Sequence, residues 1–326
     1  MSDSHKRVLV TGATGFIGAN LARRLVLDKH DVHLLVRPAD ARWRIDPIAG
    51  RVHLHEVTLH DQQRVEEIVK AIDPQWVFHL AAYGSYSSQR DVQTIVATNY
   101  NGTVNLVEAC LQTGFEAFVN AGSSSEYGHQ DHAPSELELT EPNSHYAATK
   151  AAATLYCRFT AKQTNRRLST LRLYSVFGPW EDPTRLLPTL MIYGMRGELP
   201  HLVAPTIARD YVYVDDAVDA FILNAQTPTD DPGAVFNVGS GVQTSLDQLV
   251  QLVREQLNVN AEPEWGSMPD RDWDTDVWVS DPTGIRAALG WKPAHDLEDG
   301  LREFATWIKS DEKIRRHYAT SRALPQ

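Results

Sequence analysis

The first half of the chain alternates short apolar runs with longer segments whose apolar residues recur at helical spacing. Six buried strands are predicted from the apolar runs Val8–Val10, Val32–Val36, Val52–Val57, Trp76–Leu80, Ala117–Ala121 and Leu168–Leu173. Helical patterns follow the first run up to about Lys29 and recur at about Gln62–Ile72, Asp91–Thr113 and Ser144–Gln163. This alternation predicts an α/β fold, in which helices cover both faces of a doubly wound parallel sheet. Right-handed crossovers then place the carboxyl ends of the strands, where ligands bind, at one edge.

The regular pattern ends after Leu173, where prolines at 179, 183, 188, 200 and 205 predict loops and short helices. It resumes with a strand at Tyr211–Val214, a helix at about Asp215–Asn224 and a strand at Val235–Val238. Amphipathic helices are predicted at Leu246–Leu257 and Leu297–Ile308. We therefore assign residues 1–173 and about 211–240 to the sheet domain. Residues 174–210 and 241–326 form a smaller, mainly C-terminal lobe that we expect to bind the substrate.

The composition is that of an ordinary globular protein with an acidic balance. Lys and Arg number 31 against 42 Asp and Glu, so the net charge is 31 − 42 = −11. This charge disfavours non-specific binding of nucleic acid or of an anionic membrane. No apolar run approaches the ~18 residues of a membrane span, and the first residues lack a signal-peptide layout. Cys110 and Cys157 are too few for a disulfide framework. These features predict a cytoplasmic protein without a nucleic-acid or membrane partner.

A glycine-rich turn follows the first predicted strand directly and precedes the first helix. Gly12 permits a tight turn, Gly15 lets the backbone approach a pyrophosphate, and Gly18 allows close packing of the helix on the strand. The N–H groups and the positive dipole end of the helix then face the phosphates. The turn predicts a dinucleotide-binding (Rossmann) domain with cofactor contacts at Gly12, Thr14, Gly15, Phe16, Ile17 and Gly18.

The end of the second strand in such a domain selects the cofactor. A carboxylate there binds the 2′-hydroxyl of NAD, whereas an arginine accommodates the 2′-phosphate of NADP. Arg37, not an acid, follows Leu34–Val36, and Arg42 and Arg44 come shortly after. Because a phosphate dianion prefers the planar guanidinium fork, we predict NADP as the cofactor, with NAD as the alternative.

Tyr146 and Lys150 stand four residues apart on the helix predicted after the fifth strand, so they point the same way. An ammonium about 4 Å from a phenol, at an effective dielectric of ~20, favours the phenolate by roughly 4 kcal/mol, or about 3 pKa units. The spacing therefore predicts that Lys150 lowers the pKa of Tyr146 enough for acid–base catalysis near neutral pH.

Two more segments stand at predicted strand ends. After the fifth strand, Ser123, Ser124 and Ser125 offer hydroxyls that can hydrogen-bond a substrate oxygen as its charge changes. After the fourth strand, His79 is followed by Leu80, Ala81 and Ala82. The small side chains there leave room for a flat cofactor ring.

In this order and spacing, these segments resemble the extended short-chain dehydrogenase/reductase family, the nucleotide-sugar epimerase/dehydratase group. The resemblance covers nearly the whole chain and rests on the TGxxGxxG turn, the HLAA stretch, the serine-rich Tyr-Gly segment and Tyr146-x-x-x-Lys150. It extends to Arg209–Asp216, Asn237–Gly241 and Leu289–Pro293. It implies an NAD(P)-dependent enzyme whose substrate is a nucleotide-diphosphate sugar.

The resemblance also implies residue roles. Tyr146 is the acid–base, Lys150 holds the nicotinamide ribose, and Ser123 matches the catalytic serine, with Ser124 or Ser125 as a neighbouring alternative. Arg209 and Arg271 match arginines that contact the nucleotide and the diphosphate, where charged bidentate hydrogen bonds are strong. The implied substrate contacts are Ser124, Ser125, Ser175, Arg209 and Arg271, and the further cofactor contacts are Arg37, Leu59, Leu80, Ala81, Ala82, Tyr146 and Lys150.

Two positions depart from the family pattern. Thr58 stands where an aspartate usually precedes the residue that holds adenine, which here is Leu59. Ser175 replaces the asparagine of the family's Arg-x-x-Asn stretch, which changes how the substrate is held.

Members of the family share hydride transfer at a sugar carbon, often C4, and then diverge in the overall reaction. Dehydratases usually carry an acid directly after the catalytic serine or threonine, whereas Glu126 here stands one position late. The Gly-Ser-Ser-x-Glu-Tyr-Gly pattern resembles that of GDP-4-keto-6-deoxyhexose reductases, and Arg37 suits exchangeable NADPH. We expect a 4-keto-(6-deoxy)hexose reductase. The alternatives are an epimerase that retains NAD(P), a 4,6-dehydratase and a non-catalytic NADP-binding protein.

Two expectations concern metals and assembly. No metal site is expected, because His129 and His132, the nearest pair, lack a supporting cluster of cysteines or acids. A homodimer is expected, because in similar proteins the helices matching 91–113 and 144–163 form a four-helix interface. Close approach of these helices is permitted by the small residues Ala147, Ala148, Ala151 and Ala152.

Overall fold

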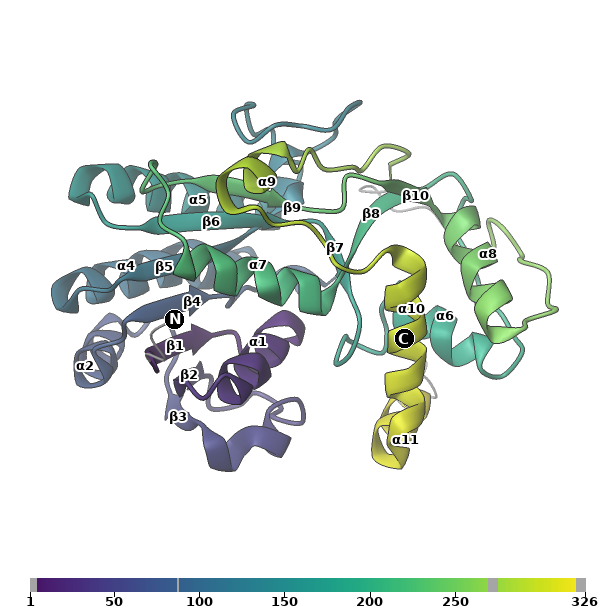
Figure 1. Cartoon of the computed structure of the whole chain (residues 1–326), viewed down its shortest axis with the longest axis horizontal. Coiled ribbons are helices and arrows are strands. Elements are labelled where there is room, and N and C mark those ends of the chain that lie inside the picture. Colours follow the sequence, from purple (N-terminus) through teal and green to yellow (C-terminus); the bar gives the residue numbers. More distant parts are fainter. Residues whose placement is uncertain (1–4, 87, 269–274, 321–326) are drawn as a thin grey trace.

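A computed structural model of the chain describes residues 5–86, 88–268 and 275–320 (Figure 1). Its centre is a parallel sheet of seven strands in the order β3-β2-β1-β4-β5-β6-β9. The strands are β1 (Arg7–Thr11), β2 (Asp31–Val36), β3 (His53–Glu56), β4 (Trp76–His79), β5 (Ala117–Ser123), β6 (Leu168–Leu173) and β9 (Val235–Val238). This order reverses between β1 and β4, which confirms the predicted doubly wound sheet.

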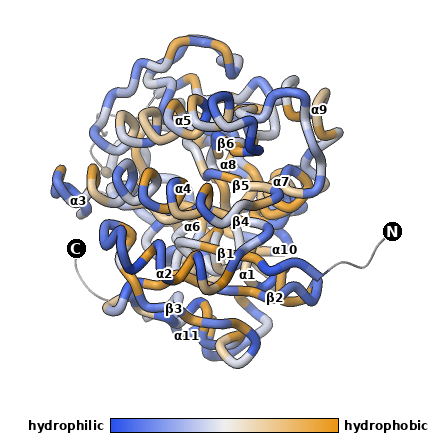
Figure 2. Tube along the Cα trace, turned by 90° about the vertical axis from the view of Figure 1, so that its left-hand side faces the viewer, coloured by the Kyte–Doolittle hydropathy of each residue, from blue (hydrophilic) through white to orange (hydrophobic). Residues whose placement is uncertain are grey.

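Helices cover both faces of this sheet because successive strand residues point to opposite sides. Val8 and Val10 join the core cluster beneath one set of helices, while Leu9 between them joins the other cluster. The first set is α1 (Phe16–Leu27), α7 (Val214–Gln226) and α9 (Thr283–Leu289). The second set is α2 (Gln62–Ile72), α4 (Gly102–Thr113) and α5 (His145–Thr164). Hydrophobic residues follow the central strands, and the surrounding loops are mostly hydrophilic (Figure 2).

The long helix predicted at 91–113 is interrupted. It begins as α3 (Val92–Val96), widens into a π-helical turn, η2 (Ala97–Asn101), and continues as α4. The wide turn directs Asn99 into the protein, where its amide bonds both backbone groups of Tyr83 at 2.8 Å and the Thr149 hydroxyl at 3.0 Å. Through these hydrogen bonds, Asn99 ties the segment after β4 to α5. Wide helical turns of this kind, called π-bulges, are frequent at functional sites.

A smaller lobe stands beside the carboxyl end of the large sheet (Figure 1). Its sheet has the order β10-β8-β7, formed by β10 (Gln243–Ser245), β8 (Ala208–Tyr213) and β7 (Ser175–Phe177). A separate apolar core fills this lobe, to which four helices contribute, α6 (Leu186–Gly194), α8 (Leu246–Leu257), α10 (Leu297–Ser310) and α11 (Glu312–Thr320). The strand predicted at Tyr211–Val214 begins earlier, at Ala208, because it pairs with β7 and β10.

Two more findings bear on the predictions from sequence. Of the alanines predicted to permit close helix approach, Ala147 and Ala151 are buried within the molecule, whereas Ala148 is exposed. In the described part of the chain, no helix combines the length and apolar character that a membrane span requires.

Asp210 of β8 joins the two sheets through a buried carboxylate. It accepts hydrogen bonds from the backbone N–H and the hydroxyl of Ser240, the N–H of Gly241, and the N–H and hydroxyl of Ser280, at 2.6–3.0 Å. A Cβ on Gly239 would lie 2.2 Å from the Ser280 hydroxyl, so only glycine fits beside this cluster. The Arg-Asp-Tyr and Asn-Val-Gly-Ser-Gly stretches are therefore two halves of one structural contact.

We predict that Asp210→Asn destabilises the protein by about 2–4 kcal/mol, because an amide N–H₂ would face donors that then lose their acceptor. Urea unfolding followed by circular dichroism measures this change. The matched control is Asp230→Asn at an exposed position, which should shift the free energy of unfolding by less than about 0.5 kcal/mol. Equal effects of the two substitutions would contradict the structural role of Asp210.

Candidate active site

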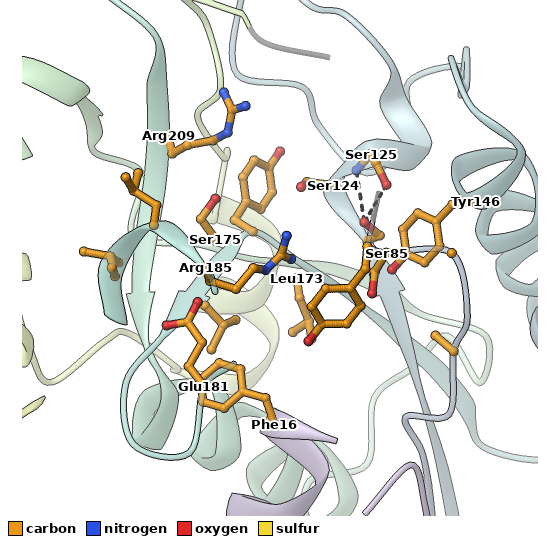
Figure 3. Close-up of a pocket in the computed structure, with 18 of the residues that line it drawn as sticks. Phe16, Ser85, Ser124, Ser125, Tyr146, Leu173, Ser175, Glu181, Arg185 and Arg209 are labelled. Atoms are coloured by element: carbon orange, nitrogen blue, oxygen red, sulfur yellow. Dashed lines mark hydrogen bonds between the residues drawn. The ribbon is translucent and has the colours of Figure 1, made fainter. Parts of the chain in front are cut away.

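A cavity of about 1440 Å³ opens at the carboxyl edge of the large sheet, between the sheet and the smaller lobe. Most residues predicted for the site line it together, namely Gly12, Gly15, Phe16, Ile17, Gly18, Leu80, Ala82, Ser123, Ser124, Ser125, Tyr146, Lys150, Ser175 and Arg209. Figure 3 shows Tyr146 and Arg209 at opposite sides of this space, with Arg185 between them. Of the other predicted residues, Thr14, Arg37, Leu59 and Ala81 are not part of the lining, and Arg271 lies outside the described residues.

The glycine turn has the geometry of a phosphate cradle. Gly12 has φ +73°, and a Cβ there would lie 2.6 Å from the Ala81 nitrogen. A Cβ on Gly18 would lie 2.3 Å from the Gly12 carbonyl oxygen, so helix and turn touch backbone to backbone. Helix α1 begins after Gly15, and no side chain of the described residues caps it. Its first N–H groups therefore remain available to an anion, which fits a dinucleotide pyrophosphate.

Arg37, which is predicted to bind the cofactor, and the two arginines that follow it have different surroundings. Arg37 is half-exposed and pairs with Asp40 at 2.7 Å, and Asp40 also accepts from the Thr14 hydroxyl at 2.8 Å. This chain of contacts attaches Arg37 to the glycine turn. Arg42 pairs with Glu56. Arg44 is buried and donates to the carbonyls of Trp180 and Thr14 at 2.7 and 3.2 Å, so its role is structural.

The segment after β4 is fixed by a buried histidine. His79 meets the hydroxyls of Thr11 and Thr103 at 2.7 and 2.8 Å, and burial lowers the pKa of its imidazole to about 3. The Thr11 hydroxyl also accepts from the Ala81 N–H at 3.2 Å. A neutral imidazole thus joins β1, β4 and α4 and places Leu80–Ala82 against the glycine turn. Leu59 uses its carbonyl to accept from Asn105 of α4, and its predicted contact with adenine stays a prediction.

The serine-rich segment turns sharply at the end of β5. Ser123 caps a short 3₁₀ helix, η3 (Ser124–Tyr127), by accepting from the Ser125 N–H at 3.2 Å. The Ser123 and Ser125 hydroxyls lie 2.6 Å apart (Figure 3). Ser124 is almost fully buried. Of the three hydroxyls, that of Ser123 is the one that also reaches Tyr146.

Glu126 anchors this turn from below. Its fully buried carboxylate accepts from the Ser123 N–H at 2.8 Å, the Thr154 hydroxyl at 3.0 Å and the Arg172 guanidinium at 2.9 Å. Arg172 lies in turn over the Tyr127 ring, 4.4 Å from its centroid. Because both oxygens are engaged by these donors, Glu126 positions the catalytic turn rather than meeting a substrate.

Tyr146 and Lys150 lie on the first turns of α5, which Ser144 caps by accepting from the Ala147 N–H at 3.1 Å. The predicted electrostatic effect between them is wrong in this structure. Burial raises the pKa of Tyr146, and the opposing influences are the hydrogen bond with Ser123 and the charge of Arg185. Burial lowers the pKa of Lys150, with the charge of Glu126 opposing it. Desolvation outweighs charge attraction here, so the phenol is held protonated.

Sequence reasoning missed Glu181, Arg185 and Tyr86, which also line the cavity. Burial raises the pKa of Glu181 to about 8, against the opposing charge of Arg185. Its Oε2 atom is buried and meets no hydrogen-bond partner among the described residues. Arg185 lies over the Tyr86 ring, 5.0 Å from the centroid. The only sequence signal was that Arg185 follows the Phe-Gly-Pro stretch within one loop.

This fold and site match known proteins. The sequence profile of the NAD dependent epimerase/dehydratase family matches residues 8–239. UDP-glucose 4-epimerase of Mycolicibacterium smegmatis is 32% identical, with 93% of this chain and 99% of the relative covered. dTDP-glucose 4,6-dehydratase of Streptomyces griseus is 30% identical, with 92% and 93% covered. Among solved structures, UDP-glucose 4-epimerase of Thermus thermophilus in complex with NAD has a TM-score of 0.82 and 28% identity, with 93% and 99% covered.

These similarities agree with the geometry of the cavity, which joins a dinucleotide turn to a serine, a tyrosine and a lysine. The relatives are nucleotide-sugar enzymes, and the family model is that of NAD-dependent enzymes. The comparisons therefore agree with the predicted class of substrate and with the predicted class of cofactor. The predicted resemblance at the level of the family is confirmed. The chain belongs to the NAD-dependent epimerase/dehydratase family and is an NAD(P)-dependent nucleotide-sugar enzyme of the extended short-chain dehydrogenase/reductase type.

Proposed function

We propose that the protein is an NADPH-dependent reductase that converts the C4 ketone of a nucleotide-diphosphate 4-keto-(6-deoxy)hexose into an alcohol. The observation that carries this proposal is that Ser123, Tyr146 and Lys150 share one cavity with the glycine turn and with Arg209. The smaller lobe, built around β10, β8 and β7, then holds the nucleotide, with Ser175, Arg209 and Arg271, which lies outside the described residues, as its contacts. Arg209 lies over the Trp278 ring, 5.2 Å from its centroid, so its fork is aligned by an aromatic face.

The residues of the chain provide the proton and its alignment. The nicotinamide, when bound, supplies the hydride that forms the new C4–H bond. The Tyr146 hydroxyl donates its proton to the C4 oxygen. The C=O double bond thus becomes a C–O single bond, with a new C–H bond on the carbon and a new O–H bond on the oxygen. Ser123, which hydrogen-bonds Tyr146, stabilises the oxygen while its charge develops. Because desolvation raises the pKa of the half-buried Tyr146, this residue begins the step in the protonated form that reduction requires.

Dehydration is disfavoured by the same geometry. Dehydratases of the family usually carry an acid directly after the catalytic serine or threonine, whereas Ser124 and Ser125 stand there in this chain. Glu126 is engaged by three donors beneath the turn. Glu181 is the carboxylate among the described cavity residues, and it lies on the opposite wall near Phe16 (Figure 3).

A second candidate is a UDP-hexose 4-epimerase, which the names of the relatives favour. The same tyrosine would accept the proton from the C4 hydroxyl and return it after the sugar turns over. A retained cofactor would then be neither consumed nor released. The two functions therefore differ in net redox change rather than in the residues that perform them.

We predict that the protein consumes NADPH when a nucleotide 4-keto-6-deoxyhexose is added, and not when the corresponding 4-hydroxy sugar is added. NADPH absorbance and product analysis by chromatography measure the two outcomes. Exchange of the C4 configuration of a UDP-hexose without net NADPH consumption would establish the epimerase instead.

Tyr146→Phe should lower turnover about 100-fold or more, because it removes the proton donor. Cofactor binding and the unfolding transition should stay close to those of the wild type, since the ring remains in place. Steady-state kinetics and fluorescence titration with NADPH check both points. The control Tyr156→Phe changes a tyrosine of the same helix that bonds Glu108 and should leave turnover near that of the wild type. Wild-type turnover in Tyr146→Phe would remove this residue from the mechanism.

We further propose NADP(H) rather than NAD(H) as the preferred cofactor. Arg37 supports this choice, because it is half-exposed and connected to the glycine turn through Asp40 and Thr14. A 2′-phosphate would take over the contact that Arg37 now makes with Asp40, and charge-assisted contacts of this kind are strong.

Arg37→Ala should raise the Kd of NADPH by about 10- to 100-fold and leave the Kd of NADH nearly unchanged, because one charged hydrogen bond contributes about 1.5–3 kcal/mol. Isothermal titration of both cofactors measures this difference. The control is Arg42→Ala, since Arg42 already pairs with Glu56. Tighter binding of NADH than of NADPH by the wild type would refute the preference.

We also propose a homodimer formed through α4 and α5. The exposed side of α5 carries an apolar stripe in which Leu155 and Phe159, one turn apart, are 59% and 61% exposed. Ala148 and Ala152 continue this stripe towards the start of the helix. A second copy packed against it would remove these apolar groups from water.

Phe159→Asp should convert a dimer of twice 36.5 kDa into a monomer, because a buried unpaired carboxylate is strongly unfavourable. Multi-angle light scattering measures the mass. The control Leu27→Asp alters a similarly exposed leucine on α1 and should leave the dimer intact. A monomeric wild type would contradict the proposal.

A further inference from the structure

Three side chains with metal-ligating atoms meet on β2 and β3, towards the amino end of β2 and away from the cavity. His33 and His53 are paired across the two strands, and Asp31 stands at the start of β2. One ligand atom of each residue lies within 4.8 Å of the other two. The rings of His33 and His53 are stacked, with centroids 4.6 Å apart, so that both present Nε2 to the carboxylate of Asp31.

The separations fit a tetrahedral metal ion. His33 Nε2 and His53 Nε2 each lie 3.3 Å from a carboxylate oxygen of Asp31. Bond lengths of about 2.0–2.2 Å at tetrahedral angles hold neighbouring ligand atoms about 3.3–3.5 Å apart. The two distances end on different oxygens of Asp31, and one ligand atom of each residue lies within 4.8 Å of the other two, so side-chain rotations would bring both nitrogens to the required distance from one oxygen.

The His33 imidazole is arranged as a metal ligand. Its Nε2 atom is buried and faces the Asp31 carboxylate, 3.3 Å from one of its oxygens. Its other nitrogen, Nδ1, lies 3.0 Å from His55 Nε2, a contact that fixes the ring and lets Nδ1 carry the proton. Metal-bound histidines commonly have such a partner on the second nitrogen.

We propose that Asp31, His33 and His53 form a binding site for one divalent transition-metal ion, with Zn²⁺ as its representative. Two imidazoles and one carboxylate suit zinc, whereas Mg²⁺ and Ca²⁺ prefer oxygen ligands. Three protein ligands leave a fourth position for water. The ion would join β3, the edge strand, to β2 and so stabilise this side of the sheet.

The neighbouring cations do not exclude an ion there. The charge of Arg7 lowers the pKa of His33, and the charge of Arg64 lowers that of His55. Arg7 pairs with Asp73 at 2.8 Å, and Arg64 pairs with Glu67 at 2.9 Å. Both charges are thus balanced by their own partners. Among the described residues, His132 also lies beside two carboxylates, those of Asp131 and Glu138. Hydrogen bonds with them already engage both nitrogens of its ring.

The test is calorimetric titration of the full chain, without an affinity tag, with Zn²⁺ in a buffer that does not chelate it. The wild type should bind one ion with a Kd below about 100 µM, and thermal unfolding should move to higher temperature when the ion is present. His53→Ala should weaken binding about tenfold or more and abolish the thermal shift. His53 is mostly exposed, so its replacement should not disturb folding.

His132→Ala provides the matched control, since it removes an exposed histidine with two carboxylate partners. Its titration should be indistinguishable from that of the wild type. Failure of the wild type to bind, or binding that survives in His53→Ala and disappears in His132→Ala, would overturn the proposal. None of these readouts depends on enzymatic activity, so the outcome is independent of the proposed reaction.

Discussion

The buried carboxylate of Glu126 is the contact on which the geometry of the active site depends. It ties together the Ser123 backbone at the end of β5, Thr154 on α5 and Arg172 on β6. Because α5 also carries Tyr146 and Lys150, one carboxylate fixes the serine relative to the tyrosine. Removing one partner of such a buried pair leaves an uncompensated charge, which makes the arrangement hard to alter piecemeal.

Buried carboxylates play the same part elsewhere. Asp210 gathers donors from two segments of the smaller lobe, and Asp216 at the start of α7 accepts from the N–H groups of Ala294 and His295. The buried side-chain amide of Asn237 has a similar role: its oxygen accepts from the Tyr127 hydroxyl, and its nitrogen donates to the Pro134 carbonyl. Several motif residues that suggest chemistry in the sequence therefore hold loops together, so that the cavity between the two sheets keeps its shape.

The sequence predicts the large sheet well because each strand has an apolar run and each crossover helix has its own period. The glycine turn and the placement of Tyr146 and Lys150 follow from local spacing for the same reason. The π-turn at Asn99, the three-residue strands β7 and β10, and the pairing of His33 with His53 were not predictable. They depend on contacts between distant segments, and short elements carry no period.

The pKa of Tyr146 shows why spacing alone does not determine chemistry. The i,i+4 relation with Lys150 correctly places both residues at one cavity, but it carries no information on how much water each group loses. Burial raises the pKa of the phenol and lowers that of the ammonium, so each group is driven towards its neutral form. A phenol with a raised pKa keeps its proton near neutral pH and is therefore available as a proton donor. A positive charge bound beside the phenol would favour the phenolate instead, so a bound nicotinamide would change the balance that burial sets on its own.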